Sequence, residues 1–456
     1  MAMRKAEKRA LREGRGEFAE WMKVCRHFFP DLPEWLNGMV DPRNKSYISY
    51  PQAVLVLMCV MKNVSSLVTM KEMNDSFNEN AAIKNLGILA GEEGLEEMPD
   101  WQTANNYFER LDPGEVGAIR RRMVVRLMRS KQFDRYKFKG CWKIVIDGTG
   151  IAYFKERHCE HDLVTKVVDK ETGRTRLLYF HKVLEAKVIL SPKVVISIDT
   201  EFIENESEDV TKQDCELNAA KRLLGRIKEQ YPRLPVCVLA DGLYATMPFM
   251  GLCIEHGFHY IINLKEGRQK TVYDDFRTLV GTEGYRHKKN GLCGIENGTG
   301  AFRNKMDEIS GKEQPCNVFE YRYKNYSDGE IKEPHFVWVT DMAITGATLE
   351  SFILAGRQRW KIENEGFNSQ KNGIYKIEHL CSRDPNAMKI HYLITQIADI
   401  SMQLFLAFNK VINAIKAPIK DVARRIGEFF WKSPLDEAVM KYINKKTAMW
   451  IVADKT

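Results

Sequence analysis

The sequence predicts an α/β protein, in which a mixed sheet is flanked by helices and lies between two helical regions. Apolar residues recur every three or four positions over residues 16–135, which is the period of a helix that buries one face. Short β-branched runs alternate with helical stretches over 142–264. Helical patterns return over 348–372 and 386–415. The order of these patterns predicts the architecture.

The composition is that of a folded protein of several domains. The chain has 456 residues, of which 44% are hydrophobic and 29% charged, and these values exclude wholesale disorder and a fibrous repeat. The longest apolar run, 53–61, ends at Lys62, whereas a membrane span needs about 20 residues. The ten cysteines include no Cys-x-x-Cys pair. We therefore expect a cytoplasmic protein with reduced thiols and no membrane contact.

Two short apolar strands each end on an aspartate. Asp147 closes the strand predicted at 142–147, and Asp241 follows the strand predicted at 235–240. The other elements predicted in this region are a β-hairpin at 177–190 and 193–200, helices at 211–230 and 245–256, and a strand at 258–264. Ligands and catalytic groups gather at strand ends in α/β sheets. An aspartate there is also a common turn residue or helix cap, so neither position alone identifies a site.

A polar, glycine-rich stretch follows these strands. Alternation typical of strands returns at 317–324 and 335–340, which predicts a β-rich insertion at about 265–345 and not a separate fold. Trp338 lies in the last of these strands. It could stack on an extruded base, but a tryptophan of the core is the favoured interpretation.

The helix predicted before the first strand is strongly basic. Nine positive residues and one acidic residue, Asp134, lie between Arg120 and Lys139. A solvated helix face normally mixes signs, so this bias favours a polyanion partner. We expect phosphate contacts from Arg120, Arg121, Arg122, Arg126 and Arg129. Residues 1–15 carry six further basic residues and form either a basic arm or a solvated helix end.

A third carboxylate comes from the segment 356–371. If this segment is helical, Arg359 and Glu363 are four residues apart and share a face, with Lys371 near it. Glu365 is rotated by about 200° from Glu363 and cannot serve the same site. The alternative without a function is an ordinary intrahelical ion pair.

Three carboxylates that converge from two strands and a helix would form a site of hard oxygen ligands. Mg²⁺ prefers such ligands, completed by a substrate phosphate. Two such ions about 4 Å apart activate a water or hydroxyl and stabilise the leaving oxygen of an in-line displacement at phosphorus. Asp147, Asp241 and Glu363 are therefore the predicted catalytic residues and metal ligands. Arg359 and Lys371 would bind backbone phosphates.

Four short motifs follow one another along the chain. They are Ile146-Asp147-Gly148-Thr149, Lys212-Gln213-Asp214-Cys215-Glu216 with Lys221-Arg222, Leu239-Ala240-Asp241-Gly242-Leu243-Tyr244 and Arg359-Trp360-Lys361-Ile362-Glu363-Asn364-Glu365. Each motif is weak alone. In this order, with the aspartates 94 residues apart and the glutamate 122 residues further on, they make the chain resemble the DDE transposases of bacterial insertion sequences, specifically the IS-four-like group. The resemblance covers about residues 40–450.

The helix motif departs from the signature of that family, which is Tyr, two residues, Arg, three residues, Glu, six residues and Lys. Arg359 and Glu363 fit this signature. Gly356 stands at the Tyr position, so a phosphate contact is missing or supplied elsewhere. Gln370 stands at the Lys position, and Gly366 resembles a one-residue insertion that shifts the lysine by one place.

The resemblance implies a ribonuclease-H-like catalytic domain at 139–372, interrupted by the β-rich insertion. A helical DNA-binding region at 1–138 would precede it, and a helical region at 373–456, for dimerisation or DNA contact, would follow. The implied reaction is Mg²⁺-dependent endonuclease cleavage at the element ends and strand transfer into target DNA, with Mn²⁺ as a substitute metal. The implied partners are double-stranded DNA, as terminal inverted repeats and as target, and a second copy in a homodimeric synaptic complex. A nucleoid-associated location follows from these partners.

Two other functions stay open. A nuclease or junction resolvase of the same fold would cut DNA without joining it. A non-catalytic remnant would only bind DNA, although the three intact acidic positions argue against it.

A group of potential metal ligands lies at His158, Cys159 and His161, next to Asp162. A set so closely spaced does not easily surround one zinc ion tetrahedrally. A polar hairpin loop is therefore favoured over a zinc site. His181 is expected to be a core histidine or a supporting residue and not a general base.

Overall fold

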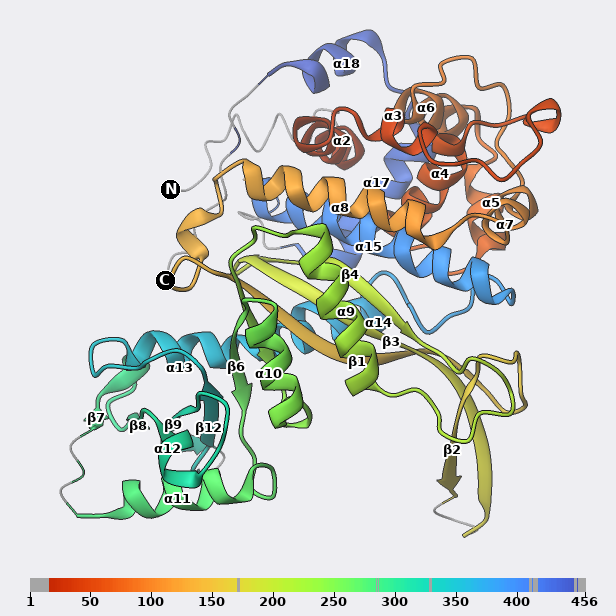
Figure 1. Cartoon of the computed structure of the whole chain (residues 1–456). Helices are drawn as coiled ribbons and strands as arrows, with labels where there is room; N and C mark the ends of the chain where they lie inside the picture. Colours follow the sequence, from red (N-terminus) through yellow and green to blue (C-terminus); the bar gives the residue numbers. More distant parts are fainter. Residues whose placement is uncertain are drawn as a thin grey trace.

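The computed structural model describes residues 16–169, 173–283, 285, 287–327, 330–409, 412, 417–446 and 449. Figure 1 shows a layer of helices on one side of a long sheet, and a lobe at one end of that sheet. The expected basic arm at residues 1–15 lies outside the described residues. Within the described ranges, no helix has both the length and the apolar character that crossing a membrane requires.

The helical layer is built from helices of both the N-terminal and the C-terminal parts of the described chain. It comprises α2 (Gly16–Phe28), α3 (Leu32–Asn37), η1 (Lys45–Tyr47), α4 (Gln52–Val64), α5 (Met70–Phe77), α6 (Asn80–Ala90), α7 (Trp101–Phe108), α8 (Pro113–Arg129), η2 (Asp134–Tyr136), α15 (Pro385–Phe408), α17 (Ile419–Lys432) and α18 (Glu437–Asn444). Helix α15 packs against α2, α4, α7 and α8, while α17 packs against α2, α4 and α6. The two helical regions that the sequence sets apart thus share one apolar core, in which α4 is buried along its whole length.

The basic helix α8 is shorter than the sequence indicates. Asp112 begins it by accepting a hydrogen bond from the Gly114 N–H (2.9 Å). The helix ends at Arg129, and Lys131 then takes a left-handed φ of 59°, which a continuing helix does not allow. The positive residues up to Lys139 therefore lie partly on a turn and not on one helical face.

One large sheet runs through the rest of the described chain (Figure 1). Its first part consists of β1 (Trp142–Phe154), β2 (Leu163–Val168), β3 (Thr175–Ser191), β4 (Val194–Ile203), β5 (Val236–Ala240) and β6 (His259–Asn263), with α9 (Glu216–Gln230), η3 (Gly242–Tyr244) and α10 (Met247–Glu255) between strands. The strand order is β2-β3-β1-β5-β6-β12-β9-β8-β7, and β4 pairs with β3. β5 is parallel to β1 and β6, and the other pairs are antiparallel. The predicted mixed sheet flanked by helices, and the hairpin of β3 and β4, are confirmed.

Strand β1 is longer than predicted. It continues past Asp147 to Phe154 because β3 pairs with it along almost its whole length. The parallel neighbour β5 accompanies only its first part, where Val145 lies opposite Leu239 at the end of the pairing. Asp147 therefore lies where β1 loses one of its two neighbours, and this makes room for other groups.

The segment predicted as a β-rich insertion forms the lobe and continues the same sheet. It contains α11 (Lys270–Gly281), β7 (Lys288–Asn290), η4 (Leu292–Gly294), β8 (Thr299–Arg303), α12 (Met306–Ser310), β9 (Asn317–Arg322), β10 (Asn325–Ser327), β11 (Glu330–Lys332) and β12 (His335–Thr340). β12 joins it to the core by antiparallel pairing with β6. Trp338 is 1% exposed and stacks between Phe319 and Phe336, with ring centroids 5.0 and 5.7 Å away. It is a core residue, as favoured from the sequence.

The segment after β12 returns to the central sheet as a broken helix. It runs through α13 (Leu349–Arg357), η5 (Gln358–Trp360), the π-helix η6 (Ile362–Asn368) and α14 (Ser369–Asn372). The helical prediction for this segment is confirmed, but the sequence did not indicate the change of helix type. A π-turn holds one residue more than an α-turn and is frequent at functional sites.

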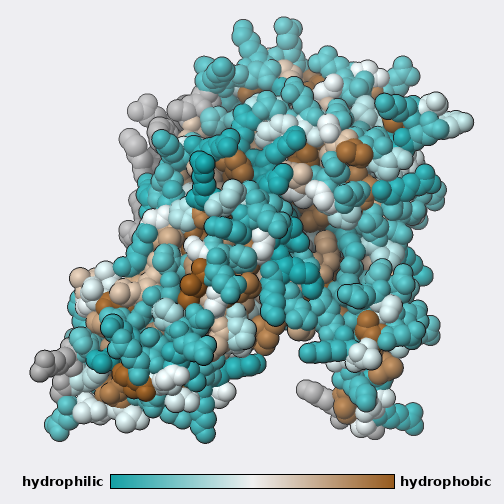
Figure 2. All heavy atoms as spheres, viewed as in Figure 1, coloured by the Kyte–Doolittle hydropathy of each residue, from teal (hydrophilic) through white to brown (hydrophobic). Residues whose placement is uncertain are grey.

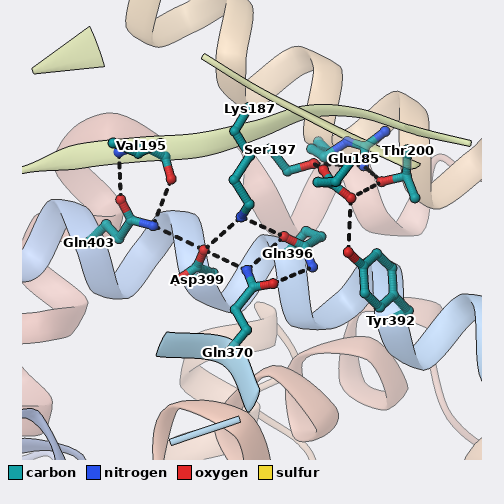
Figure 3. A network of polar contacts seen from close by, with 11 residues as sticks. Glu185, Lys187, Val195, Ser197, Thr200, Gln370, Tyr392, Gln396, Asp399 and Gln403 are labelled. Atoms are coloured by element: carbon teal, nitrogen blue, oxygen red, sulfur yellow. Dashed lines mark hydrogen bonds and ion pairs between the residues drawn. The ribbon is translucent and has the colours of Figure 1, made fainter. Parts of the chain in front are cut away.

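A buried ammonium group fastens this broken helix and α15 to the sheet (Figure 3). The fully buried Lys187 of β3 places its Nζ 3.3 Å from Gln396 Oε1 and 3.5 Å from Asp399 Oδ2. Gln370 of α14 donates to the same two oxygens at 2.9 Å. Gln403 also donates to Asp399 (3.0 Å). The carboxylate of Asp399 is thus met by three donors from three elements.

Replacing Lys187 alone should strongly destabilise the fold. Lys187→Met leaves the Asp399 carboxylate buried without its cation, so we expect the free energy of unfolding to fall by about 3–5 kcal/mol. The double variant Lys187→Met with Asp399→Leu removes both charges and should recover most of this loss. Urea unfolding followed by circular dichroism measures both. A single variant as stable as the wild type would show that the ammonium group has no such role.

Candidate active site

The strand register brings the two predicted aspartates side by side. Val145 and Leu239 are paired across β1 and β5, and Asp147 and Asp241 each lie two residues further along. Asp147 Oδ1 accepts a hydrogen bond from the Gly148 N–H (2.9 Å). In the same way, a backbone N–H at the start of η3 donates to Asp241 Oδ1 (2.8 Å). In each carboxylate the Oδ1 atom is held by the backbone, which fixes the orientation of the side chain.

Arg359 links the third carboxylate to this pair. Its guanidinium lies 3.5 Å from Asp147 Oδ2 and 2.8 Å from Glu363 Oε1. The arginine is only 6% exposed, so these contacts form in a poorly solvated place where they are stronger than on a surface. The shared helix face predicted for Arg359 and Glu363 is therefore present, and the two residues form the ion pair that was the alternative without a function. Arg359 also reaches Asp147, and its predicted contact with phosphate stays a prediction. Glu365 instead pairs with Lys361 (2.6 Å), consistent with its different direction on the helix.

Two glycines explain the departures of this helix from the family signature. A Cβ on Gly356 would lie 2.8 Å from the indole of Trp338, so the buried tryptophan fills the place of the expected tyrosine. Gly366 lies within the π-helix, where a one-residue insertion is accommodated by the wider turn. A Cβ there would lie 3.2 Å from Lys187 Cε. Gly366 thus lets the π-helix approach the buried ammonium group closely.

A fourth carboxylate lies near Asp147, and the sequence analysis did not assign it. Glu216, the first residue of α9, accepts a hydrogen bond from the Tyr244 hydroxyl (3.0 Å) and pairs with Lys182. A Cβ on Gly148 would lie 2.7 Å from the Glu216 carboxyl carbon, so the Glu216 side chain lies directly against the backbone next to Asp147. The signal was present, because Glu216 ends one of the four motifs that carry the resemblance.

The site has an excess of negative charge around Asp147. The pKa of Asp147 is raised to about 6, chiefly by burial and to a smaller extent by the charges of Asp241 and Glu216, while the Gly148 N–H and Arg359 act to lower it. Lys265 lies 4.0 Å from Asp241 and is largely exposed. Carboxylate oxygens are the ligands that a hard divalent cation prefers, and a cation beside Asp147 would offset the cost of ionising it. The residues therefore fit a bound divalent cation.

The basic residues predicted to bind DNA take different positions. Arg122 and Arg129 are exposed on α8, Arg121 is half-buried, and Arg126 pairs with Asp31. Arg120 is a correction to the prediction, because it is 2% exposed and its guanidinium donates to Ser197, Thr200 and Asp199. It anchors α8 to β4 and does not face a ligand. The sequence pattern alone does not show that Arg120 points into the core while the neighbouring arginines lie nearer the surface.

Lys371 lies next to the candidate site in sequence but contacts another group. It pairs with Glu378 at 2.7 Å. The residue before it, Gln370, points instead into the buried cluster of Figure 3. The π-helix shifts the register of the helix, so the lysine occupies a different place from the one that regular helical spacing predicts.

The described surface is mostly hydrophilic on the face shown in Figure 2. The outline is hollowed between the lobe of α11 to β12 and the hairpin of β2 and β3. β6 points toward this side in Figure 1, and β5 is parallel to it. The carboxyl end of β5, which Asp241 follows, therefore points toward the same side as the hollow.

A trio of acidic residues on two neighbouring strands and a helix defines a class of domain, and the comparison of the sequence with protein families identifies it. Residues 143–398 match the model of the transposase DDE domain. The match covers more than half of the chain, so this protein belongs to that transposase family. All three acidic residues lie inside the matched range.

Two further comparisons add little. No curated protein matches the sequence. The piggyBac transposase, in the cryo-EM structure of its synaptic complex with hairpin DNA, is similar with a TM-score of 0.41 and 10% sequence identity, over 94% of this chain and 83% of that chain. This likeness is too distant to support a comparison of function.

Neutralising Asp147 should stabilise the metal-free protein. The folded-state pKa of about 6 lies above the unfolded value of 3.8, so ionised Asp147 opposes folding above pH 6. Asp147→Asn should raise the free energy of unfolding there by up to about 3 kcal/mol, and the gain should shrink as the pH falls toward 4. Urea unfolding in EDTA at several pH values measures this. The control Glu365→Gln should not show the same pH dependence, and a gain independent of pH would contradict the assignment.

Proposed function

We propose that this protein is a DNA transposase that cleaves at the ends of an insertion sequence of the IS-four-like group and transfers the freed strand into target DNA. The observation that carries the proposal is that Arg359 bridges Asp147 and Glu363, while the charge of Asp241 on the neighbouring strand acts on Asp147. The family match supports transposition. The parallel strands β1, β5 and β6, with antiparallel β3 and β4 beside them, favour a ribonuclease-H-like catalytic domain at 139–372.

Asp147, Asp241 and Glu363 would hold divalent cations, Mg²⁺ or in its place Mn²⁺, which supply activation of a water or 3′-hydroxyl and stabilisation of the leaving oxygen. Arg359 orients Asp147 and Glu363 through the two ends of its guanidinium. The half-exposed Trp360 beside it offers an aromatic face, 4.9 Å from the Arg359 guanidinium carbon. This chain thus provides a fixed carboxylate geometry before any substrate binds, which is how enzymes lower the reorganisation needed in the transition state.

The DNA partners are assigned from the basic surface. Terminal inverted repeats would contact the helical region 1–138, with Arg122 and Arg129 of α8 as phosphate ligands and Arg121 and Arg126 at their side. Lys371 is a further candidate if DNA displaces Glu378 from it. The C-terminal region 373–456 would support a homodimeric synaptic complex.

Removal of any one carboxylate should abolish cleavage. Asp147→Asn, Asp241→Asn and Glu363→Gln should each lower Mg²⁺-dependent cutting of DNA that carries the flanking inverted repeats by at least about 100-fold. Binding of the same DNA should be kept. Glu365→Gln is the matched control, because its carboxylate lies on the same π-helix but pairs with Lys361. A variant of the trio that still cuts at the wild-type rate would refute the proposal.

The same assay separates the alternatives. A product in which the cut end is joined to target DNA favours a transposase. Cutting without joining favours a nuclease or resolvase. Metal-independent binding with no cutting favours a non-catalytic remnant.

The exposed arginines of α8 should contribute to DNA affinity through phosphate contacts. The double variant Arg122→Gln with Arg129→Gln should weaken DNA binding and reduce the dependence of log K on log salt by about 0.9 for each lost contact. Arg120→Gln should leave this slope unchanged and lower stability, since its guanidinium is buried. Fluorescence anisotropy over a salt series measures the slope. An equal effect of Arg233→Gln with Arg424→Gln, elsewhere on the surface, would show that only net charge matters.

A further inference from the structure

A second group of metal-ligating side chains lies outside the candidate active site. His158, Cys159 and Asp162 come from the loop between β1 and β2, and His181 comes from β3. One ligand atom from each residue lies within 4.8 Å of all the others. The loop residues alone do not easily surround an ion. His181 supplies the ligand that the loop could not.

The distances in this group are those of a tetrahedral zinc site. Cys159 Sγ lies 3.6 Å from His181 Nε2 and 3.4 Å from Asp162 Oδ1, and that Oδ1 lies 3.0 Å from His181 Nε2. Zinc bond lengths of about 2.3 Å to sulfur and about 2.0–2.1 Å to nitrogen or oxygen give tetrahedral edges of about 3.6 Å for sulfur–nitrogen and about 3.3 Å for oxygen–nitrogen pairs. Three edges of the coordination polyhedron are therefore already close to their required lengths.

The remaining contacts orient the ligands toward a common point. Asp162 is fully buried, and its Oδ2 accepts the backbone N–H groups of His158 (2.5 Å) and Cys159 (3.1 Å), which leaves Oδ1 for the cluster. The His158 ring stacks on Phe154 at 4.3 Å. The buried His158 Nδ1 has no hydrogen-bond partner among the described residues. Buried polar atoms without partners are rare and call for a ligand.

The neighbouring His161 is excluded from the cluster. Its Nδ1 lies 2.9 Å from the backbone oxygen of Asn205. Asn205 in turn donates its side-chain amide to the Asp162 carbonyl (2.8 Å). These hydrogen bonds fix the conformation of the loop, as residues that surround metal ligands commonly do.

We propose that His158, Cys159, Asp162 and His181 bind one zinc ion. A thiolate, two imidazoles and a carboxylate are borderline-soft ligands that suit zinc and not Mg²⁺. Four protein ligands leave no open position, so the ion is structural. It connects the loop after β1 to β3 and fixes the base of the hairpin of β2 and β3. The ligand His181 pairs with Ala152, which lies five positions after Asp147 on β1, or about 16 Å of extended strand, so the two metal sites are distinct.

Metal analysis of the full-length protein tests this proposal. After removal of metals with EDTA, addition of zinc and desalting, we expect about one tightly bound zinc per chain, measured by mass spectrometry of the elements. Cys159→Ser and His181→Gln should lose this zinc. His161→Gln, in the same loop, and Asp147→Asn, in the candidate active site, should keep it. Folded wild-type protein that binds no zinc would overturn the proposal, as would zinc retained by both ligand variants.

Cobalt gives a readout that does not depend on the stability of the variants. Co²⁺ in the wild-type site should show strong visible bands typical of tetrahedral geometry and a thiolate charge-transfer band. Both should be lost when zinc is added. A spectrum of octahedral Co²⁺ without thiolate bands would overturn the assignment. Thermal unfolding should show that zinc raises Tm in the wild type and in His161→Gln alike.

Discussion

The buried ammonium group of Lys187 is the contact on which the arrangement of sheet, broken helix and α15 depends. It enters from β3, meets Asp399 of α15, and shares that carboxylate with Gln370 of α14. Gln370 directly follows the π-helix that carries Glu363. Its hydrogen bonds to Gln396 and Asp399 therefore help to fix the position of the third acidic residue. Gly366 favours this close approach, because a Cβ there would lie 3.2 Å from Lys187 Cε and the lysine would have to shift. A buried ion pair contributes little net stability, but it requires one geometry, since its partners cannot be left unpaired.

The candidate site shows the opposite arrangement. Asp147 is hard to ionise mainly because it is buried, and the charges of Asp241 and Glu216 add to this effect. Arg359 offsets part of this repulsion and holds Glu363 in place. The buried carboxylate of Asp147 therefore lowers the local stability. The buried polar contacts of Lys187, Gln370 and Asp399 keep the π-helix in position against the sheet. Side chains with shifted pKa values are common at functional sites.

Much of this arrangement could be predicted from the sequence. Two apolar runs that each end on an aspartate indicated neighbouring strand ends, and the Arg359–Glu363 spacing indicated a shared helix face. Other parts depend on contacts between residues far apart in the chain. The burial of Arg120 and the indole of Trp338 beside Gly356 have no local signal, whereas Glu216 lies in a motif whose sequence does not show that its carboxylate reaches Asp147. His181 also joins the loop at His158 only through the pairing of β1 with β3.

The continuity of the sheet limits how the lobe can move. β12 lies against β6 through three consecutive residue pairs, so the lobe is an extension of the central sheet and not a body on a flexible linker. It can twist with the sheet, but it cannot swing open without losing those pairs. Under the proposed function, a duplex that entered the hollow would meet a wall of fixed position on the side of the lobe. Adjustment of shape would then fall mainly to the nucleic acid, and sequences that bend easily would be accepted at lower cost.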